Sequence, residues 1–327
     1  MIRLRALHPV LYLIIILTSL VATYAFKLRT RGIFACTAEG YRADRYLGYC
    51  NADAYGDYDH GAVWFGLEPE VSRIAADADV LFLGSSRMEF AFSTQSTDAW
   101  FASEHIQHYL LGFSHTENAT FTMPLLGRVK PRAKVYVINV DNFFSDVESQ
   151  PGAPILHERD MRRRYDEKRL WQQLHRQICT RLAALCGKQF AYFRSNKAGH
   201  WVVRGVGGFK SKPVAEGPSK DREKWDQYAA IAEQVVSKLP VDRSCVLLTL
   251  VPYPSTPSAE AKAIADAAGL ELITPQVDDL RTFDGSHLDH ASAERWSKAF
   301  FESAGPRIRQ CLNPAQAAQP AASTTSR

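Results

Sequence analysis

The feature that most constrains the fold is a short apolar run, Val80 to Leu83, which leads into the turn Gly84-Ser85-Ser86. The run is too short for a helix and is closed by a glycine, so it suits a strand buried on both faces of a parallel sheet. Similar patterns alternate with helical ones, which predicts an α/β fold with a three-layer parallel sheet. The expected strands are residues 79–84, 106–111, 134–140, 245–251 and 270–274, and the expected helices include Ala259 to Ala268 and Ala291 to Ala304.

Two short segments contain candidate catalytic residues. Ser86 lies at the carboxyl end of a buried strand, where open α/β sheets bind their ligands. Asp284 lies three residues before His287, and this spacing allows the carboxylate to orient the imidazole as the base for a serine. Together they predict a split Ser-His-Asp hydrolase site. Two alternatives stay open: the Gly-Ser-Ser turn is only a helix cap, or His290 is the base because the turn has another register.

The same segments resemble the first and last conserved blocks of the SGNH/GDSL hydrolase superfamily. Gly84-Ser85-Ser86 is similar to the Gly-Asp-Ser block, with Ser86 at the nucleophile position and Ser85 where an aspartate is usual. Asp284-Gly285-Ser286-His287 is similar to the last block. The resemblance covers roughly residues 78 to 305. It implies a parallel sheet of the flavodoxin-like type and catalytic roles for Ser86, His287 and Asp284.

Between these blocks the resemblance implies an oxyanion hole made by a glycine and an asparagine. Gly112, within Leu111-Gly112-Phe113-Ser114, corresponds to the glycine, and Asn142 is the best candidate for the asparagine. The usual Gly-x-Asn-Asp block is absent, and Val140-Asp141-Asn142-Phe143 stands in its place. Asn139 is an alternative donor if its strand ends early, and otherwise a structural polar residue.

Arg87 follows the predicted nucleophile directly. Two interpretations of this arginine remain open: it contacts substrate, or it pairs with an acid such as Glu89.

The predicted chemistry is acyl transfer through an acyl-serine intermediate. With water as acceptor the protein is an esterase, and with a sugar hydroxyl it is an O-acyltransferase. Anchored members of the superfamily that begin with Gly-Ser-Ser resemble accessory proteins that work with a membrane-bound O-acyltransferase, so the expected substrate is a polysaccharide or another cell-envelope polymer. The alternative function is a non-catalytic scaffold that binds a glycan or a partner protein, and the atypical third block keeps this alternative open.

The amino terminus predicts a membrane anchor. Residues from Pro9 to Phe26 are almost continuously apolar, with Arg3 and Arg5 before them, and about 18 such residues are near the minimum for a transmembrane helix. The run is longer than the roughly 7 to 15 apolar residues of a cleaved signal peptide, so we expect an uncleaved signal anchor. Basic residues also follow the run, at 27, 29 and 31, and the charge pattern therefore does not decide the orientation.

Six cysteines indicate the compartment. They suggest the pairs Cys36 with Cys50, Cys179 with Cys186, and Cys245 with Cys311, although six cysteines allow 15 pairings and the sequence alone does not choose among them. Paired cysteines are typical of an oxidising compartment. The alternative is six buried thiols in a cytosolic domain. We expect an extracytoplasmic, periplasmic catalytic domain on a single-pass inner-membrane anchor.

The remaining sequence defines the domain organisation. Residues 1–31 are the expected anchor, 32–312 one domain with an insertion at about 145–220, and 313–327 a disordered tail. Residues 32–65 look like an irregular segment held by cysteines. The net charge of +4 is too small to indicate nucleic-acid binding.

The insertion contains a basic helix that begins near Arg159 and continues through Trp171. It either binds an anionic glycan or lipid head group or is a solvated helical face. No histidine pair outside the site has metal-ligand spacing, so we expect surface or capping roles for these histidines, with no metal and no cofactor.

Overall fold

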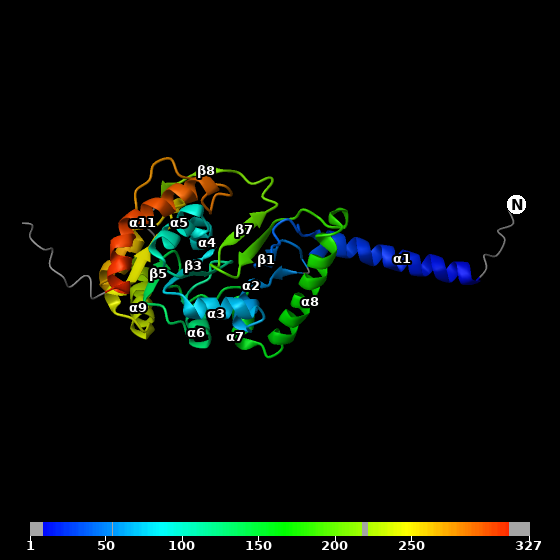
Figure 1. The fold of residues 1–327 in the computed structure, drawn as a ribbon, viewed down its shortest axis with the longest axis horizontal. Helices are drawn as coiled ribbons and strands as arrows, with labels where there is room; N and C mark the ends of the chain where they lie inside the picture. Colours follow the sequence, from blue (N-terminus) through cyan, green and yellow to red (C-terminus); the bar gives the residue numbers. More distant parts are fainter. Residues whose placement is uncertain (1–8, 54, 218–221, 314–327) are drawn as a thin grey trace, which may run out of the picture.

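A computed structural model describes residues 9–53, 55–217 and 222–313, and its centre is a five-stranded parallel sheet (Figure 1). The strand order, β12-β10-β5-β3-β4, is that of flavodoxin-like sheets, and the topological switch lies between β3 and β5. The predicted α/β class with a parallel sheet is confirmed, and each strand overlaps its expected range. The strands are β3 (Val80–Ser85), β4 (His108–Phe113), β5 (Val135–Asn139), β10 (Val246–Thr249) and β12 (Glu271–Ile273).

Helices cover both faces of this sheet because successive side chains of each buried strand point to opposite sides. Phe82 packs on Phe92 and Phe301, with ring centroids 4.7 and 6.4 Å apart, whereas Leu81 and Leu83 belong to the core on the other face. One face is covered by α4 (Ser86–Phe92), α5 (Gln95–Glu104) and α11 (His290–Leu312). The other is covered by α3 (Pro69–Asp77), α6 (Ala119–Val129), α9 (Arg222–Lys238) and α10 (Ser258–Ala268).

A second, antiparallel sheet lies between the parallel sheet and the amino-terminal helix (Figure 1). Its order is β2 (Gly56–Asp57), β1 (Arg45–Cys50), β6 (Ala191–Ser195) and β7 (Trp201–Arg204). The expectation that residues 32–65 are irregular is therefore wrong for β1. This strand pairs with β6 of the insertion, and a partner so far along the chain leaves no local sequence signal.

Shorter elements complete the chain. The helices are α2 (Asp59–Trp64), α7 (Gly152–His157) and α8 (Met161–Cys179), with 3₁₀ turns η1 (Ile33–Ala35), η2 (Ala183–Leu185) and η3 (Arg243–Cys245). Two small pairings join the insertion to the carboxyl-terminal part: β8 (Lys212–Pro213) with β13 (Arg281–Thr282), and β9 (Ala215–Glu216) with β11 (Pro254–Thr256).

The fully buried Arg194 of β6 joins the two sheets. Its guanidinium pairs with Asp59 at 2.8 Å and with Glu89 at 3.1 Å, and it donates to the carbonyl of Leu110 at 2.7 Å. Asp59 comes from α2, Glu89 from α4 and Leu110 from β4. Because removal of one partner leaves an uncompensated buried charge, this network fixes α4 against the antiparallel sheet.

Three disulfides confirm the suggested cysteine pairs: Cys36–Cys50, Cys179–Cys186 and Cys245–Cys311. They are consistent with an oxidising environment.

The helix α1 (Pro9–Thr30) projects away from the domain with its described side chains exposed (Figure 1). Its apolar part, Pro9–Lys27, has a mean hydropathy of 2.1 and is long enough to cross a membrane, a property that signal sequences share. The basic residues predicted before it, Arg3 and Arg5, and residues 314–327 of the predicted tail lie outside the described residues.

Candidate active site

The turn after β3 separates the roles of its two serines. Ser85 is buried and caps α4, with its Oγ accepting a hydrogen bond from the Arg87 N–H at 3.3 Å. Ser86 is the first residue of α4 and is partly exposed. Gly84 allows close packing at this turn, since a Cβ there would lie 3.0 Å from Met88 Cβ and 3.1 Å from Asn139 Cβ. The cap interpretation therefore applies to Ser85, which leaves Ser86 free for chemistry.

The structure brings the three predicted catalytic side chains together. Ser86 Oγ lies 2.8 Å from His287 Nε2, and His287 Nδ1 lies 2.7 Å from Asp284 Oδ2. The other carboxylate oxygen of Asp284 accepts the backbone N–H groups of Ser286 and His287, each at 2.9 Å. These bonds hold the turn in which Gly285 has a φ of +85°. The geometry is that of a nucleophile, a base and a group that orients the base.

The electrostatics of Asp284 suit this last role. Burial alone would raise the pKa of the Asp284 carboxyl, but the hydrogen bonds from His287 and Ser286 outweigh burial and hold this pKa below its usual value. The Asp284 carboxylate accepts a hydrogen bond from Nδ1–H of His287, and this tautomer leaves Nε2 to accept from the Ser86 hydroxyl.

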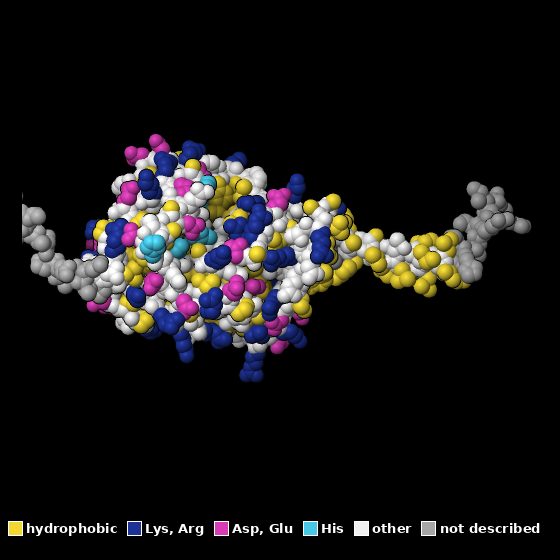
Figure 2. All heavy atoms as spheres, viewed as in Figure 1, with side chains coloured by type: hydrophobic (Ala, Val, Ile, Leu, Met, Phe, Trp, Pro, Cys, Tyr) yellow, Lys and Arg dark blue, Asp and Glu magenta, His cyan; other side chains and the backbone are white. Residues whose placement is uncertain are grey.

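Of the two histidines, His287 and not His290 lies beside Ser86 and is the candidate base. Aromatic rings hold the His287 imidazole, with the Phe90 ring centroid at 4.5 Å and that of Phe283 at 5.8 Å. His290 is the first residue of α11, with a side chain that is 76 % exposed and 3.9 Å from Glu294. Figure 2 shows a hollowed, largely hydrophobic area with lysine and arginine at its rim, between α4 and β7 of Figure 1.

Arg87 connects the elements around the site. Its guanidinium pairs with Asp141 after β5, donates to the Ser286 carbonyl at 3.2 Å and to Ser286 Oγ at 3.1 Å, and lies 3.7 Å above the Tyr253 ring. The interpretation that Arg87 pairs with an acid is therefore confirmed, but the acid is Asp141 and not Glu89. Because its hydrogen bonds hold the turn of the base, Arg87 is placed to position His287 relative to Ser86.

Gly112 does not have a free amide for an oxyanion. Its N–H donates to Glu89 Oε1 at 2.8 Å inside the protein, so we remove Gly112 from the predicted donor set. Burial raises the pKa of Glu89 to about 8, although the nearby Arg194 and this N–H both act to lower it. No local sequence signal distinguished Gly112 as a partner of this buried carboxyl group.

The two asparagine candidates differ in their surroundings. Asn142 has a φ of +55°, lines a surface cavity and donates only a long bond of 3.3 Å to Asp141. Asn139 is fully buried at the end of β5, and its Oδ1 accepts the Val251 N–H at 2.9 Å, as a structural residue would. Among the described residues, Asn139 Nδ2 has no hydrogen-bond partner. Asn142, which lines a surface cavity, stays the first candidate for the asparagine donor, and Asn139 stays the alternative.

Two neighbouring polar cavities lie on the surface near Asn142, and neither has Ser86, His287 or Asp284 in its lining. The first, of about 470 Å³, is lined by residues that include His115, Asn142 and Gln150. The second, of about 390 Å³, shares His115 and Gln150 and reaches Tyr49 and Lys168. A cavity of about 530 Å³ at the opposite, amino-terminal edge of the sheet is mostly apolar and lies away from Ser86.

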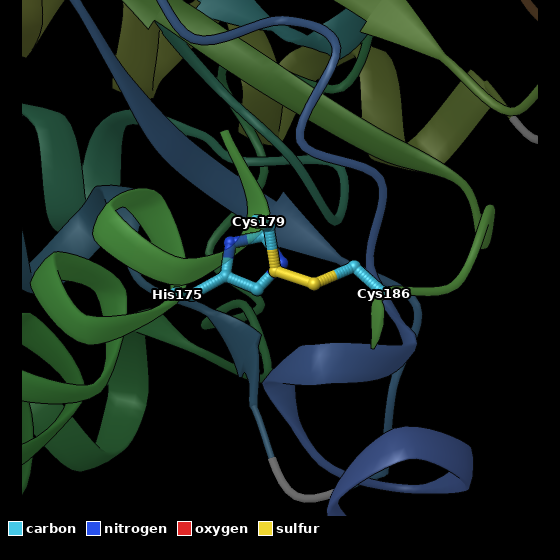
Figure 3. A group of neighbouring side chains, drawn as sticks. All are labelled: His175, Cys179 and Cys186. Carbon is cyan, nitrogen blue, oxygen red and sulfur yellow. A yellow bond between two sulfur atoms is a disulfide. The ribbon is translucent and has the colours of Figure 1, made fainter. Parts of the chain in front are cut away.

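Potential metal ligands meet at two places in the described residues. His175, Cys179 and Cys186 are neighbours, but the two sulfur atoms form a disulfide beside the imidazole (Figure 3). The ring nitrogens of His175 face the Tyr41 hydroxyl at 3.0 Å and the Cys36 carbonyl at 3.2 Å. With the disulfide closed, this group has no thiolate to offer a metal.

The second group is Asp98, His108 and His200. The two Nε2 atoms are 3.3 Å apart, and Asp98 lies 3.5 Å from His200 Nδ1. Burial lowers the pKa of both imidazoles, which favours a neutral pair in which one ring donates to the other. The expected surface or capping roles are therefore wrong for His108 and His200.

A second Asp-x-x-His unit lies inside the domain, and the sequence analysis missed it. His60 Nδ1 is 2.9 Å from Asp57, and its Nε2 is 2.9 Å from Glu117. Burial alone would lower the pKa of His60, but the two carboxylates outweigh burial and raise it to about 10. The expected surface role is wrong for His60 as well, and its spacing from Asp57 was the signal available in the sequence.

No protein-family model matches this chain, and neither does any curated protein or solved structure.

Proposed function

We propose that the protein is a serine acyltransferase or acylesterase of the SGNH type. The observation that carries this proposal is the pair of hydrogen bonds that joins Ser86, His287 and Asp284, at 2.8 and 2.7 Å. The strand-turn-helix setting of Ser86 at the switch point of the sheet supports it, because open α/β sheets bind ligands there.

The mechanism follows from the positions of these groups. His287 Nε2 takes the hydroxyl proton as Ser86 Oγ attacks the acyl carbonyl, and Asp284 stabilises the imidazolium. Collapse of the tetrahedral intermediate breaks the bond to the leaving alkoxide, which receives the proton from His287. The acceptor hydroxyl then gives its proton to His287 as its oxygen attacks the acyl carbon. Collapse of this second intermediate breaks the bond to Ser86 Oγ, which takes the proton back from His287.

The oxyanion donors are the backbone N–H of Ser86 and the side-chain amide of Asn142. As the first residue of α4, Ser86 has an N–H without an intrahelical acceptor. A positioned donor of this kind typically accounts for about 100- to 1000-fold in rate. Asn139, with its unpartnered Nδ2 among the described residues, is the alternative to Asn142.

The proposed substrate is a glycan or another cell-envelope polymer. The apolar α1 and the three disulfides support an extracytoplasmic, periplasmic domain on an inner-membrane anchor, where a membrane-bound O-acyltransferase is a possible source of acyl groups. The polar cavities next to Asn142 offer hydroxyl, amide and imidazole groups to an acceptor sugar. No metal and no cofactor take part in the proposed reaction.

The test compares water with a sugar acceptor. Because a positioned hydroxyl exceeds the effective concentration of bulk water by orders of magnitude, a transferase should hydrolyse a chromogenic acetyl ester slowly and release acyl groups faster when an oligosaccharide is added. Ser86→Ala should abolish both reactions, whereas Ser85→Ala, the neighbouring control, should keep them. Fast hydrolysis that is indifferent to glycans would identify an esterase.

A non-catalytic scaffold is the second candidate, and the hydrogen bond from Gly112 to Glu89 favours it. It removes one of the donors that the resemblance implies. If no acyl-enzyme forms under any condition while the glycan still binds, the scaffold is the function.

A further inference from the structure

The carboxyl-terminal half of α8 and the turn after it expose large apolar side chains that nothing in the described residues covers. The inner face of α8 is buried through Tyr165, Gln172 and His175, which point into the domain. The outer face and the turn after it carry large apolar side chains that are 38 to 66 % exposed: Leu170, Trp171, Leu174, Leu182 and Leu185. We refer to these five residues as the outer patch. Exposed apolar groups that are neighbours in this way mark a site of interaction.

The outer patch lies beside the point where the chain leaves α1. The Gly187 N–H donates to the Phe34 carbonyl at 2.7 Å, and the ring of His175 lies 5.7 Å from that of Phe34. Phe34 follows the end of α1 by only a few residues, within η1. Figure 1 shows α8 crossing the end of the domain from which α1 projects, and Figure 2 shows hydrophobic side chains gathered there.

Charged residues, most of them basic, surround the outer patch, and the exposed Glu167 lies one helical turn before Leu170 and Trp171. Arg163 precedes Leu170 by two helical turns and is exposed, and Arg181 and Lys188 follow α8, also exposed. Lys27 and Arg29 lie at the carboxyl end of α1 itself. Arginine and lysine near the end of a membrane-spanning helix suit anionic lipid headgroups. Tryptophan is enriched at membrane interfaces.

We propose that the outer patch of α8 rests in the interfacial region of the lipid bilayer that α1 crosses. An amphipathic helix with leucine and tryptophan on one side and arginine around it places its apolar face at the headgroup and acyl boundary. The exposed apolar side chains of α8 lie in its carboxyl-terminal half, next to the end of α1, so the contact we propose is made there. This inference rests on the proposed membrane location of α1 and is independent of the proposed chemistry.

Tryptophan fluorescence of the full chain in vesicles tests the contact. The vesicles contain equal parts of phosphatidylglycerol and of phosphatidylcholine with brominated acyl chains, and flotation after alkaline washing establishes separately that α1 is inserted. We expect the bromolipid to quench part of the emission and this part to be lost in Trp171→Phe. Trp100→Phe is the matched control, because α5 lies far from α1 in Figure 1, and it should keep the quenching.

A second variant keeps the fluorophore and removes the apolar contact. In the double variant Leu170→Glu and Leu174→Glu, bromolipid quenching should fall and quenching by aqueous iodide should rise, with an unchanged circular dichroism spectrum. The inference is overturned if Trp171→Phe leaves bromolipid quenching unchanged in chains that float, or if iodide quenches Trp171 in the unmodified protein as strongly as in the double variant. In either case the outer patch faces water or a protein partner.

Discussion

The protein contains the same local unit, Asp-x-x-His, at two places with different surroundings. In the candidate active site, the Asp284 carboxylate accepts the His287 backbone N–H at 2.9 Å and lies 2.7 Å from its Nδ1. Inside the domain, the Asp57 carboxylate accepts the His60 backbone N–H at 3.2 Å and lies 2.9 Å from its Nδ1. The spacing therefore dictates how the imidazole is oriented, and it does so in both units.

The units differ in what the other ring nitrogen meets. His287 presents Nε2 to the hydroxyl of Ser86 and is 18 % exposed, so a proton is free to move between them. His60 presents Nε2 to a second buried carboxylate, Glu117, and is fully buried. With a pKa raised to about 10 by its two carboxylates, His60 stays charged at neutral pH. The partner on Nε2, and not the Asp-x-x-His spacing, distinguishes a base from a structural cation.

Replacement of His287 should have the largest effect on activity. His287→Ala removes the group that takes the Ser86 proton, so kcat/KM for an acyl ester should fall by about 10⁴- to 10⁶-fold. The thermal midpoint should change little because the site is partly exposed. Initial rates and differential scanning fluorimetry on the same preparation check both expectations. An activity within tenfold of the unmodified protein would show that His287 is not the base.

Replacement of His60 should lower the stability of the protein and leave its activity unchanged. His60→Gln leaves the buried carboxylates of Asp57 and Glu117 without their shared cation, which should cost about 3 to 5 kcal/mol and lower the thermal midpoint by roughly 6 to 20 °C. The turnover of the folded fraction should remain. The exposed His290→Gln is the matched control and should be neutral. A stable but inactive His60→Gln protein would contradict a structural role.

Replacement of Arg87 distinguishes positioning from substrate contact. Because Arg87 holds the Ser286 turn, Arg87→Ala should displace His287 and reduce kcat by up to about 100-fold with little change in KM. Arg87→Lys should rescue little, since lysine lacks the planar fork that reaches the carbonyl, the hydroxyl and Asp141 together. A rise in KM with kcat unchanged would instead support the substrate-binding role expected from the sequence.

The charge of His60 also predicts a pH dependence of stability. The pKa of His60 is about 10 in the folded protein, above its ordinary value of 6.5. Its stabilisation is therefore complete below pH 6.5 and is lost as the pH rises towards 10. The difference in thermal midpoint between the unmodified protein and His60→Gln should shrink over this range. A difference that stays constant from pH 6 to pH 10 would mean that His60 is neutral throughout.

The parts of the molecule that the sequence predicted well depend on local patterns. The apolar run before Gly84 identified β3, and the turn chemistry identified Ser86 and the Asp284 unit. The antiparallel sheet was missed because β1 finds its partner in β6, far along the chain. The bond of the Gly112 amide to Glu89 and the bonds of Arg87 to the Ser286 turn were missed for the same reason. The Asp57 unit had a local signal, but its Glu117 partner did not.

Covalent labelling by a fluorophosphonate tests the proposed chemistry most directly, because it requires a serine that a base has activated. Mass spectrometry of the labelled protein should locate one adduct on Ser86. The adduct should persist in His60→Gln and Ser85→Ala and be absent in His287→Ala. An unlabelled but folded protein, or an adduct on Ser85 or another serine, would contradict the assignment of Ser86, His287 and Asp284 as a catalytic unit.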